Sequence, residues 1–595
     1  MSELPSVMRI AKSTGTHADV FAAVGLADLL SSAPDFGVVR VLENDGGFEI
    51  RRSESGAGVP SDLIPQLPGY PFLKTNEKVQ VPAKARDVVD YKAEKAKADR
   101  NKQIRASQSR GKRKIVDSET QQLMQQEQLR EDWRLLQVLN TLQGDEIANK
   151  IHETIVSREP ERFRAEVRAG LDALSHERPS GLKWPVSTVQ IFTPIAAKGY
   201  NRLKPDSTSR NDKTKDQWAD PFVEWFKYRG YFRVACPFFQ GPKAEHVRIL
   251  CPIPHDVSIQ ALGSVARELR SARVYGGPPK MDALAALTLA ELLVRHSEEY
   301  HDPDAEVFPG LRLRGRSPAD VFSGIMVTHY QSLGNAKAVS AMSTIALPDW
   351  FNIESPEDAD DWLGILDEHK RVLRGLQDDH SDEIGLLIGY RRFLEKRGDR
   401  ALWALVEFME RYGPFLIRAR EQGRRVRAFR TDYFGRIAMG TAPHLTEILA
   451  DTGFQAVATA VRKATVSAQA MKAMKKPDYR EVRYDLLHEL RRKRSLPGAG
   501  PLMECVADFV SKYNAENARR REMGKSAPRN VTTDEFAEFT ALVEKHGASL
   551  VGALLGAYAS CREPRDEEVT EPEGDQPEQS ATPASVPELK KRRIR

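Results

Sequence analysis

The residues that could support catalysis form no complete motif. The segment 296–301 (HSEEYH) holds two histidines, but they are five residues apart, whereas zinc ligands on a helix recur at i and i+4. The segment 523–526 (MGKS) ends like a phosphate-binding loop, yet Arg519 occupies the position of that motif's first glycine. The nucleophile pattern G-x-S-x-G does not occur in the sequence. We therefore expect a protein that is not an enzyme, with no catalytic residue, no metal ligand and no cofactor.

A loop at 198–204 (KGYNRLK) carries the residue types that contact nucleic acid. Four of its side chains could reach phosphates or base edges: Lys198, Asn201, Arg202 and Lys204. Gly199 permits close approach of the backbone to a ligand. The same composition also suits an ordinary solvated loop, so both interpretations stay open.

The segment 218–233 (WADPFVEWFKYRGYFR) interleaves aromatic residues with cations. Aromatic faces can stack on bases while Lys227 and Arg229 hold the backbone of a strand. The alternative is an aromatic helix buried against a sheet. That alternative is favoured because three aromatic residues share one side of the helix: Phe222, Trp225 and Phe226.

Two longer stretches of the chain are basic. Residues 84–114 contain twelve Lys and Arg against four Asp and Glu, which predicts a solvated helix or a mobile arm. Lys112, Arg113 and Lys114 at its end could contact phosphates of any sequence. In the second stretch, 462–494, a stripe of cations could follow a nucleic-acid backbone along the outside of a helical bundle. The candidate contacts there are Arg462, Lys463, Lys472, Lys475, Lys476 and Arg480.

Composition limits the class of protein. The chain has 595 residues, of which 41% are hydrophobic and 29% charged, and this is an ordinary globular balance. Its net charge is only +5, so binding to a polyanion would need local patches. The 4 cysteines lie far apart, which favours a reducing compartment. No apolar run is long enough to span a membrane. We expect a soluble, cytoplasmic protein without a membrane partner.

The elements that must position these candidates alternate between helices and strands before about 260. Periodicity predicts a helix at 17–31 with one apolar face, and a hairpin at 38–51 whose glycines accept positive φ. Short β-rich runs occur at 186–192 and within 245–253, and an apolar stretch at 320–348 could add a strand or two. Helical periodicity dominates later, at 281–298, 358–377, 384–396 and 400–420.

The fold class we expect is α+β, a mixed body followed by a mainly helical region and a helical bundle. We divide the chain into 1–260, 261–438, 439–562 and a disordered charged tail at 563–595. The last bundle helix, 533–559, begins with a capping box formed by Thr532 and Glu535. Its neighbours should share a core of Leu445, Leu449, Val457, Val461, Val506, Phe509, Val510, Phe536, Phe539, Leu550 and Leu554.

Three strings together resemble a known family. They are KGYNRLKPDS at 198–207, SLGNAKAVSAMSTIALPDW at 332–350, and the terminal RYDLLHELRRK and DFVSKYNAENARR within 483–520. They are similar to large subunits of type I CRISPR surveillance complexes (Cascade), in the lineage whose large subunit ends in a small-subunit-like helical region. The basic arm at 84–114 and the tail after 562 have no counterpart that we can match to this family.

This resemblance implies a non-catalytic role in antiviral defence. Large subunits of this family recognise the protospacer-adjacent motif (PAM) on double-stranded DNA, help to open the duplex into an R-loop, and hold the displaced single strand. The implied partners are a CRISPR RNA, target DNA, other Cascade subunits and a separate helicase-nuclease. Guide pairing supplies most of the sequence specificity in such systems. The family also implies that the bundle can be translated separately, with Met439 as a candidate start.

Two alternatives remain at this stage. The same basic patches would suit a nucleic-acid-binding scaffold of another defence or transposition assembly. A metal-dependent nuclease is also conceivable if acidic residues and histidines that are distant in sequence converge in the fold.

Overall fold

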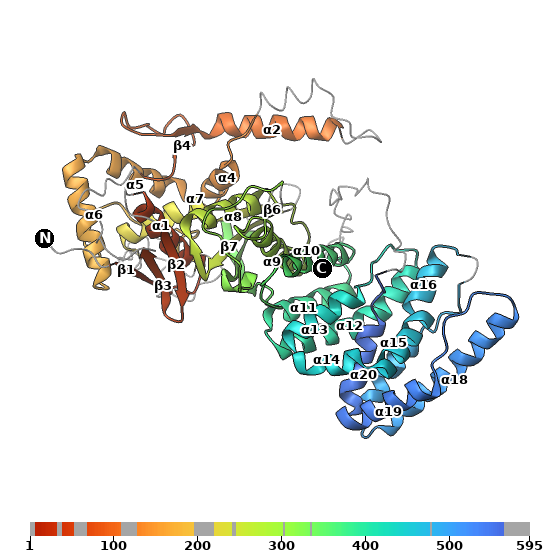
Figure 1. The fold of residues 1–595 in the computed structure, drawn as a ribbon. Coiled ribbons are helices and arrows are strands. Elements are labelled where there is room, and N and C mark those ends of the chain that lie inside the picture. The colour runs from red at the N-terminus through yellow and green to blue at the C-terminus, as the bar shows by residue number, and fades with distance from the viewer. Residues whose placement is uncertain are drawn as a thin grey trace, which may run out of the picture.

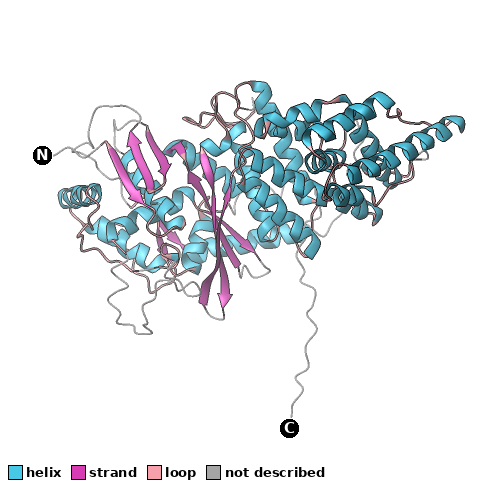
Figure 2. Ribbon diagram, turned by 90° about the horizontal axis from the view of Figure 1, so that it is seen from below, coloured by secondary structure: helices cyan, strands magenta, loops and turns pink. Residues whose placement is uncertain are grey.

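The computed structural model describes most of the chain, namely residues 6–32, 38–52, 68–108, 128–187, 189–194, 219–240, 246–301, 304–333, 336–476 and 479–564. The part of the chain up to Ala346, called here the N-terminal half, contains two four-stranded sheets and the helices that cover them. From Pro356 onward the described elements are helices, and this part is called the helical half (Figure 1). Figure 2 shows the strands gathered in one half of an elongated molecule. The expected α+β class is confirmed.

The first sheet has the strand order β1-β3-β2-β8, and its paired strands are antiparallel. The expected hairpin is confirmed, because Asn44 pairs with Gly47 across a short turn. Neither Gly46 nor Gly47 has a positive φ, so the turn does not depend on that property of glycine. The side-chain oxygen of Asn44 accepts hydrogen bonds from the backbone N–H groups of Gly46 and Gly47, at 3.1 and 2.8 Å. The strands are β1 (Val7–Ala11), β2 (Val39–Asn44), β3 (Gly47–Arg52) and β8 (Asp256–Ser258).

Helix α1 (His17–Ser31) lies between this sheet and α7 (Pro221–Val234). It is buried on nearly every side, whereas the sequence predicted a single apolar face. The two helices can pack this closely because each places a glycine at the crossing. A Cβ atom at Gly25 would overlap the carbonyl of Phe226, and one at Gly230 would overlap the carbonyl of Phe21.

The second sheet has the order β10-β9-β7-β6 and is antiparallel throughout. The apolar stretch at 320–348 forms its β9–β10 hairpin, and the run within 245–253 forms β7, as expected. The run at 186–192 was interpreted wrongly, because its described residues lie in a turn and an irregular segment. Here the strands are β6 (Cys236–Gln240), β7 (His246–Pro254), β9 (Phe322–Leu333) and β10 (Ala336–Ala346). Helices α8 (Ile259–Ser271) and α9 (Pro278–Arg295) follow β8 and pack against one another.

A smaller unit is attached to the N-terminal half. Strands β4 (Phe72–Lys74) and β5 (Val88–Asp90) pair in parallel. A small apolar cluster of Leu73, Val89, Trp133 and Leu136 holds them against α2 (Tyr91–Gln108) and α4 (Trp133–Thr141). Helices α5 (Asp145–Ser157) and α6 (Pro160–Ser175) follow, and α5 also contacts β4.

The helices predicted between 356 and 421 are confirmed. Ser355 begins the first of them with a capping box to Asp358. This region comprises α10 (Pro356–Arg374), α11 (Ser381–Glu395), α12 (Asp399–Glu421) and α13 (Thr431–Thr441). The bundle that follows comprises α14 (Thr446–Ala450), α15 (Thr452–Ala464), α16 (Val466–Ala473), α17 (Leu486–Arg494), α18 (Gly500–Glu522), α19 (Thr533–His546) and α20 (Ala548–Ala559).

The bundle core agrees largely with the sequence prediction. Phe536 and Leu550 are only partly buried, and the other expected side chains are buried. The capping box of Thr532 and Glu535 is present. The single helix expected at 533–559 is instead two helices, because Gly547 adopts φ +89° and ends α19. The expected boundary at 438/439 falls within α13.

No helix among the described residues is long and apolar enough to cross a membrane.

Candidate nucleic-acid interface

Helix α2 lies along one side of the N-terminal half (Figure 1). Lys92, Lys95 and Lys102 are exposed, and Lys97 pairs with Glu94 at 2.8 Å. At the start of the helix, Tyr91 packs on Trp133 with 5.2 Å between ring centroids, which anchors α2 to α4. The helix therefore exposes three lysines on its solvent side, with Asp99 exposed between Lys95 and Lys102.

Part of the predicted interface lies outside the described residues. The end of the basic arm, with Lys112, Arg113 and Lys114, belongs to the undescribed range 109–127. The loop side chains Lys198, Asn201, Arg202 and Lys204 belong to the undescribed range 195–218. These predictions stay as they were made from the sequence.

Lys227 and Arg229 were wrongly predicted to bind nucleic acid, because both are buried inside the N-terminal half. Lys227 donates to Glu224 at 2.6 Å and to the carbonyl oxygen of Phe192 at 3.0 Å. Arg229 pairs with Asp28 at 2.6 Å, and 3% of its side chain is exposed. The alternative of a buried aromatic helix is correct, although α7 packs mainly on α1 rather than on a sheet.

The buried charges of α7 are compensated locally. Burial raises the pKa of the Glu224 carboxyl, and the neighbouring Lys227 ammonium acts against that rise. Burial also lowers the pKa of nearby His17 to about 4. Its ring nitrogens lie 2.7 Å from the Thr328 hydroxyl and 2.8 Å from the Ile191 carbonyl oxygen. These groups hold helices and strands together, and water or a ligand does not reach them.

The predicted track at 462–494 is mostly a set of ion pairs between helices. Arg462 is 1% exposed and pairs with Glu563, so its prediction as a nucleic-acid contact is wrong. Lys463 is half-buried, with its ammonium 4.0 Å from the same carboxylate. Arg480 is also buried, with Glu516 at 2.9 Å and the ring of Tyr513 at 4.0 Å, so it is not a surface contact either.

Three predicted cations of the track do lie at the surface. Lys472 pairs with Glu421 at 2.8 Å, and 34% of its side chain is exposed. Its ammonium and the Tyr484 hydroxyl lower the pKa of the Glu421 carboxyl to about 2. Lys475 and Lys476 are exposed where α16 ends. They are the members of the predicted track whose exposure suits contact with a polyanion.

The end of α18 is a basic surface that the sequence prediction missed. Arg519, Arg521 and Lys525 are exposed there. Arg521 donates to neutral acceptors, the Pro528 carbonyl oxygen at 3.1 Å and the Asn530 side-chain oxygen at 3.2 Å. Figure 1 shows α18 running outward from the bundle. The run of three arginines at 519–521 was the available signal, and it falls at a helix C-terminus, where cations are favoured.

The return segment after α18 is fastened to the helix. The Asn514 side chain donates to the Val531 carbonyl oxygen at 2.8 Å and accepts from the Val531 N–H at 3.1 Å. Asn517 donates to the side-chain oxygen of Asn530 at 3.1 Å. These bonds fix the backbone on both sides of the basic tip, so its cations are presented from an ordered support.

We also searched the described part of the chain for metal-binding groups and reactive thiols. No group of three or more His, Cys, Asp or Glu side chains there is placed to hold a metal ion. Cys236 and Cys251 are buried, and burial raises the pKa of the Cys236 thiol to about 12. The thiolate form, which is the nucleophile, is therefore disfavoured at Cys236.

Comparison with known proteins assigns the chain to no family. No protein-family model matches it, and no curated protein matches it either.

Proposed function

We propose that this chain is a non-catalytic, nucleic-acid-binding subunit of a larger assembly. The observation that carries the proposal is the pair of basic helices that project from the molecule, α2 in the N-terminal half and the end of α18 in the bundle. Both present exposed cations on an ordered helix. Such surfaces suit contact with phosphates of any sequence.

The more specific proposal is a large subunit of a CRISPR RNA-guided DNA surveillance complex. It rests on the resemblance of three strings, and the basic helices support it only in a general way. In such a complex, the chain would recognise the protospacer-adjacent motif, help to open the duplex, hold the displaced strand and recruit a separate helicase-nuclease. The cations of α2 and α18 suit the task of holding a strand, because that task needs charge and little base readout.

The test is the salt dependence of binding to duplex and single-stranded DNA. One variant carries Lys92→Gln, Lys95→Gln and Lys102→Gln on α2, and a second carries Arg519→Gln, Arg521→Gln and Lys525→Gln at α18. We expect each to weaken binding on all sequences. Each should also reduce the slope of log K against log salt by up to about 0.9 per lost phosphate contact on duplex DNA.

A matched control removes three exposed cations that lie on neither helix, with Lys150→Gln, Arg162→Gln and Arg312→Gln. Each of these cations pairs with a carboxylate, and each side chain is at least half exposed. The control should retain the wild-type salt slope. Equal slopes in all four proteins would contradict the proposal, because the two helices would then contribute no phosphate contact.

Purification distinguishes the CRISPR assignment from its alternatives. Isolation with a short guide RNA and a backbone subunit would support a surveillance complex. Binding to nucleic acid that needs no guide would favour a scaffold of another defence or transposition assembly. Metal-dependent cleavage by the isolated chain, lost when a carboxylate is replaced, would establish a nuclease instead.

A further inference from the structure

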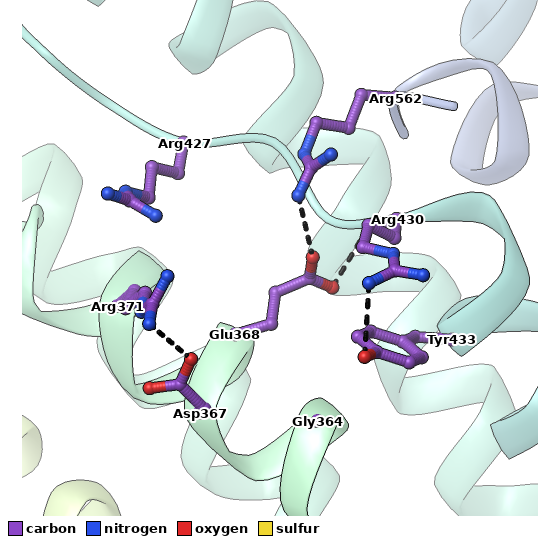
Figure 3. Close-up of a pocket in the computed structure, with 8 residues that line it drawn as sticks. All are labelled: Gly364, Asp367, Glu368, Arg371, Arg427, Arg430, Tyr433 and Arg562. Atoms are coloured by element: carbon purple, nitrogen blue, oxygen red, sulfur yellow. Dashed lines mark hydrogen bonds and ion pairs between the residues drawn. The ribbon is translucent and has the colours of Figure 1, made fainter. Parts of the chain in front are cut away.

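A small arginine-lined hollow lies in the helical half, away from the basic helices described above. Its volume is about 110 Å³. It opens between α10, the segment leading into α13, and the residues that follow α20 (Figure 3). Its walls are formed by Gly364, Asp367, Glu368, Arg371, Arg427, Arg430, Tyr433 and Arg562.

The backbone around the hollow is fixed by a short bridge between distant segments. The Arg562 N–H donates to the Phe429 carbonyl oxygen at 2.7 Å, and the Thr431 N–H donates to the Arg562 carbonyl oxygen at 2.9 Å. Glu368 accepts from the Arg430 N–H at 2.9 Å. Arg430 and Arg562 are thereby held in place before any ligand arrives.

Glycine and tyrosine shape the opposite wall. A Cβ atom at Gly364 would overlap the hydroxyl of Tyr433, so the missing side chain lets that ring approach α10. The Arg430 guanidinium lies 4.0 Å from the centre of the Tyr433 ring and donates to its hydroxyl at 3.1 Å. This stacking restricts Arg430 to one orientation beside the hollow.

The side chains around the hollow carry a net positive charge, which favours binding of an anion. Its lining has four arginines and two carboxylates, and the Arg430 guanidinium also pairs with the Asp432 carboxylate at 2.5 Å, which leaves a net charge of +1. Figure 3 shows the Glu368 carboxylate turned toward Arg562 and Arg430, with Arg371 and Arg427 across the hollow. A bound oxyanion would balance the remaining positive charge.

The size of the hollow suits one tetrahedral group. Its volume is several times the roughly 10–15 Å³ that one water molecule requires by the same measure. A phosphate group fits such a space, whereas a whole nucleotide needs a larger site. A phosphate monoester carries about −1.5 to −2 charges near neutral pH, opposite in sign to the charge around the hollow.

From these observations we propose that the hollow binds a phosphate monoester, specifically the terminal phosphate of a nucleic-acid strand. The strand as the source of the phosphate rests on the proposed function, while the phosphate chemistry rests on the hollow itself. Arg371 and Arg427 are the cations to test, because Arg430 and Arg562 also fix the backbone. Arg371 is half exposed, and its partner Asp367 lies 2.7 Å away.

The experiment compares two otherwise identical oligonucleotides, one with a 5′-phosphate and one with a 5′-hydroxyl. We expect about tenfold tighter binding of the phosphorylated strand, lost in an Arg371→Gln/Arg427→Gln double variant. Asp367→Asn should increase the preference, because it raises the charge of the lining. The preference should also fall as the pH drops below about 6, where the monoester gains a proton.

Arg411→Gln is the matched control. Arg411 pairs with Glu407 at 2.7 Å across one helical turn and is 45% exposed, against 51% for Arg371. It does not line the hollow, so the variant should keep the wild-type preference. A preference that is absent, or that survives in the double variant, would overturn the proposal.

Inorganic phosphate separates the two sources of the ligand. It should compete away the preference for the phosphorylated strand without abolishing binding of the hydroxyl strand. Phosphate binding that depends on Arg371 and Arg427, in a protein that ignores both strands, would contradict the proposed function and the strand source, and would keep the anion site. Binding of both strands equally would leave the proposed function intact and reject the hollow as a strand-end site.

Discussion

Asp28 is held by two arginines of α7 that differ in burial. The Arg229 guanidinium lies 2.6 Å from the carboxylate with 3% of its side chain exposed, and that of Arg233 lies 2.5 Å away with 54% exposed. Asp28 itself is only 4% exposed. A carboxylate in such a place depends on its buried partner, because water does not replace a lost cation there.

We expect Arg229→Ala to lower the free energy of unfolding by about 3 kcal/mol, since it leaves Asp28 with only its exposed partner. Arg233→Ala should cost less than about 1 kcal/mol, because exposed ion pairs contribute little. Urea denaturation of the two variants measures both values. Equal losses would show that burial of the pair does not determine its contribution.

Residue types alone could not separate these internal cations from surface cations. Arg462 and Arg480 resemble Lys475 and Lys476 in sequence, yet the first two are buried and the last two are exposed. The difference is set by carboxylates that are distant along the chain. Glu563, for example, is 101 residues from Arg462. The site prediction therefore failed for cations that pair with a distant carboxylate in the protein interior. It also missed the exposed end of α18.

At the scale of elements, the crossing of α1 and α7 depends on two glycines that let the helix backbones come into contact. Gly25→Ala and Gly230→Ala should each lower the free energy of unfolding by at least about 2 kcal/mol, because the added methyl group meets a backbone carbonyl that cannot move alone. Thermal or urea denaturation measures the loss.

Gly435→Ala provides the control for these glycines. Gly435 also lies within a helix, α13, but a Cβ atom there would meet no other atom within 4 Å. Alanine should stabilise this position by about 0.5 kcal/mol, because glycine weakens a helix interior. If alanine destabilised Gly435 as much as Gly25 and Gly230, the close approach of α1 and α7 would not be the reason that glycine is needed there.

Periodicity predicted most elements because it reflects which face is buried. The helices at α9 to α12 and the hairpin of β2 and β3 could be found in this way. Helix α1 could not be described fully, since the second layer that covers it, α7, is about 200 residues away in sequence. The β-rich residues at 186–192 have strand propensity, but the described part of that run forms no ladder, and propensity yields to tertiary context.

At the scale of the whole molecule, α12 connects the bundle to the rest of the helical half. It packs against α16, α17 and α20, and also against α11. Glu410 on α12 pairs with Arg494 at 2.6 Å, and Glu421 pairs with Lys472 at 2.8 Å. Gly413 lies so close to Ser560 that a Cβ atom would overlap its side chain. One continuous hydrophobic cluster runs through both halves of the molecule.

The resemblance implied that the bundle can be translated separately from Met439, which requires it to fold alone, and these contacts lead us to expect that it does not. A fragment that begins at 439 starts inside α13 and lacks α12, so it exposes the apolar faces of α16, α17 and α20. We expect the full chain to show a cooperative thermal transition, followed by circular dichroism, and the 439–595 fragment to aggregate or to show a broad transition. A cooperative transition of the 439–595 fragment would show that α12 is dispensable, and would restore an internal start at Met439 as a route to a separate small subunit.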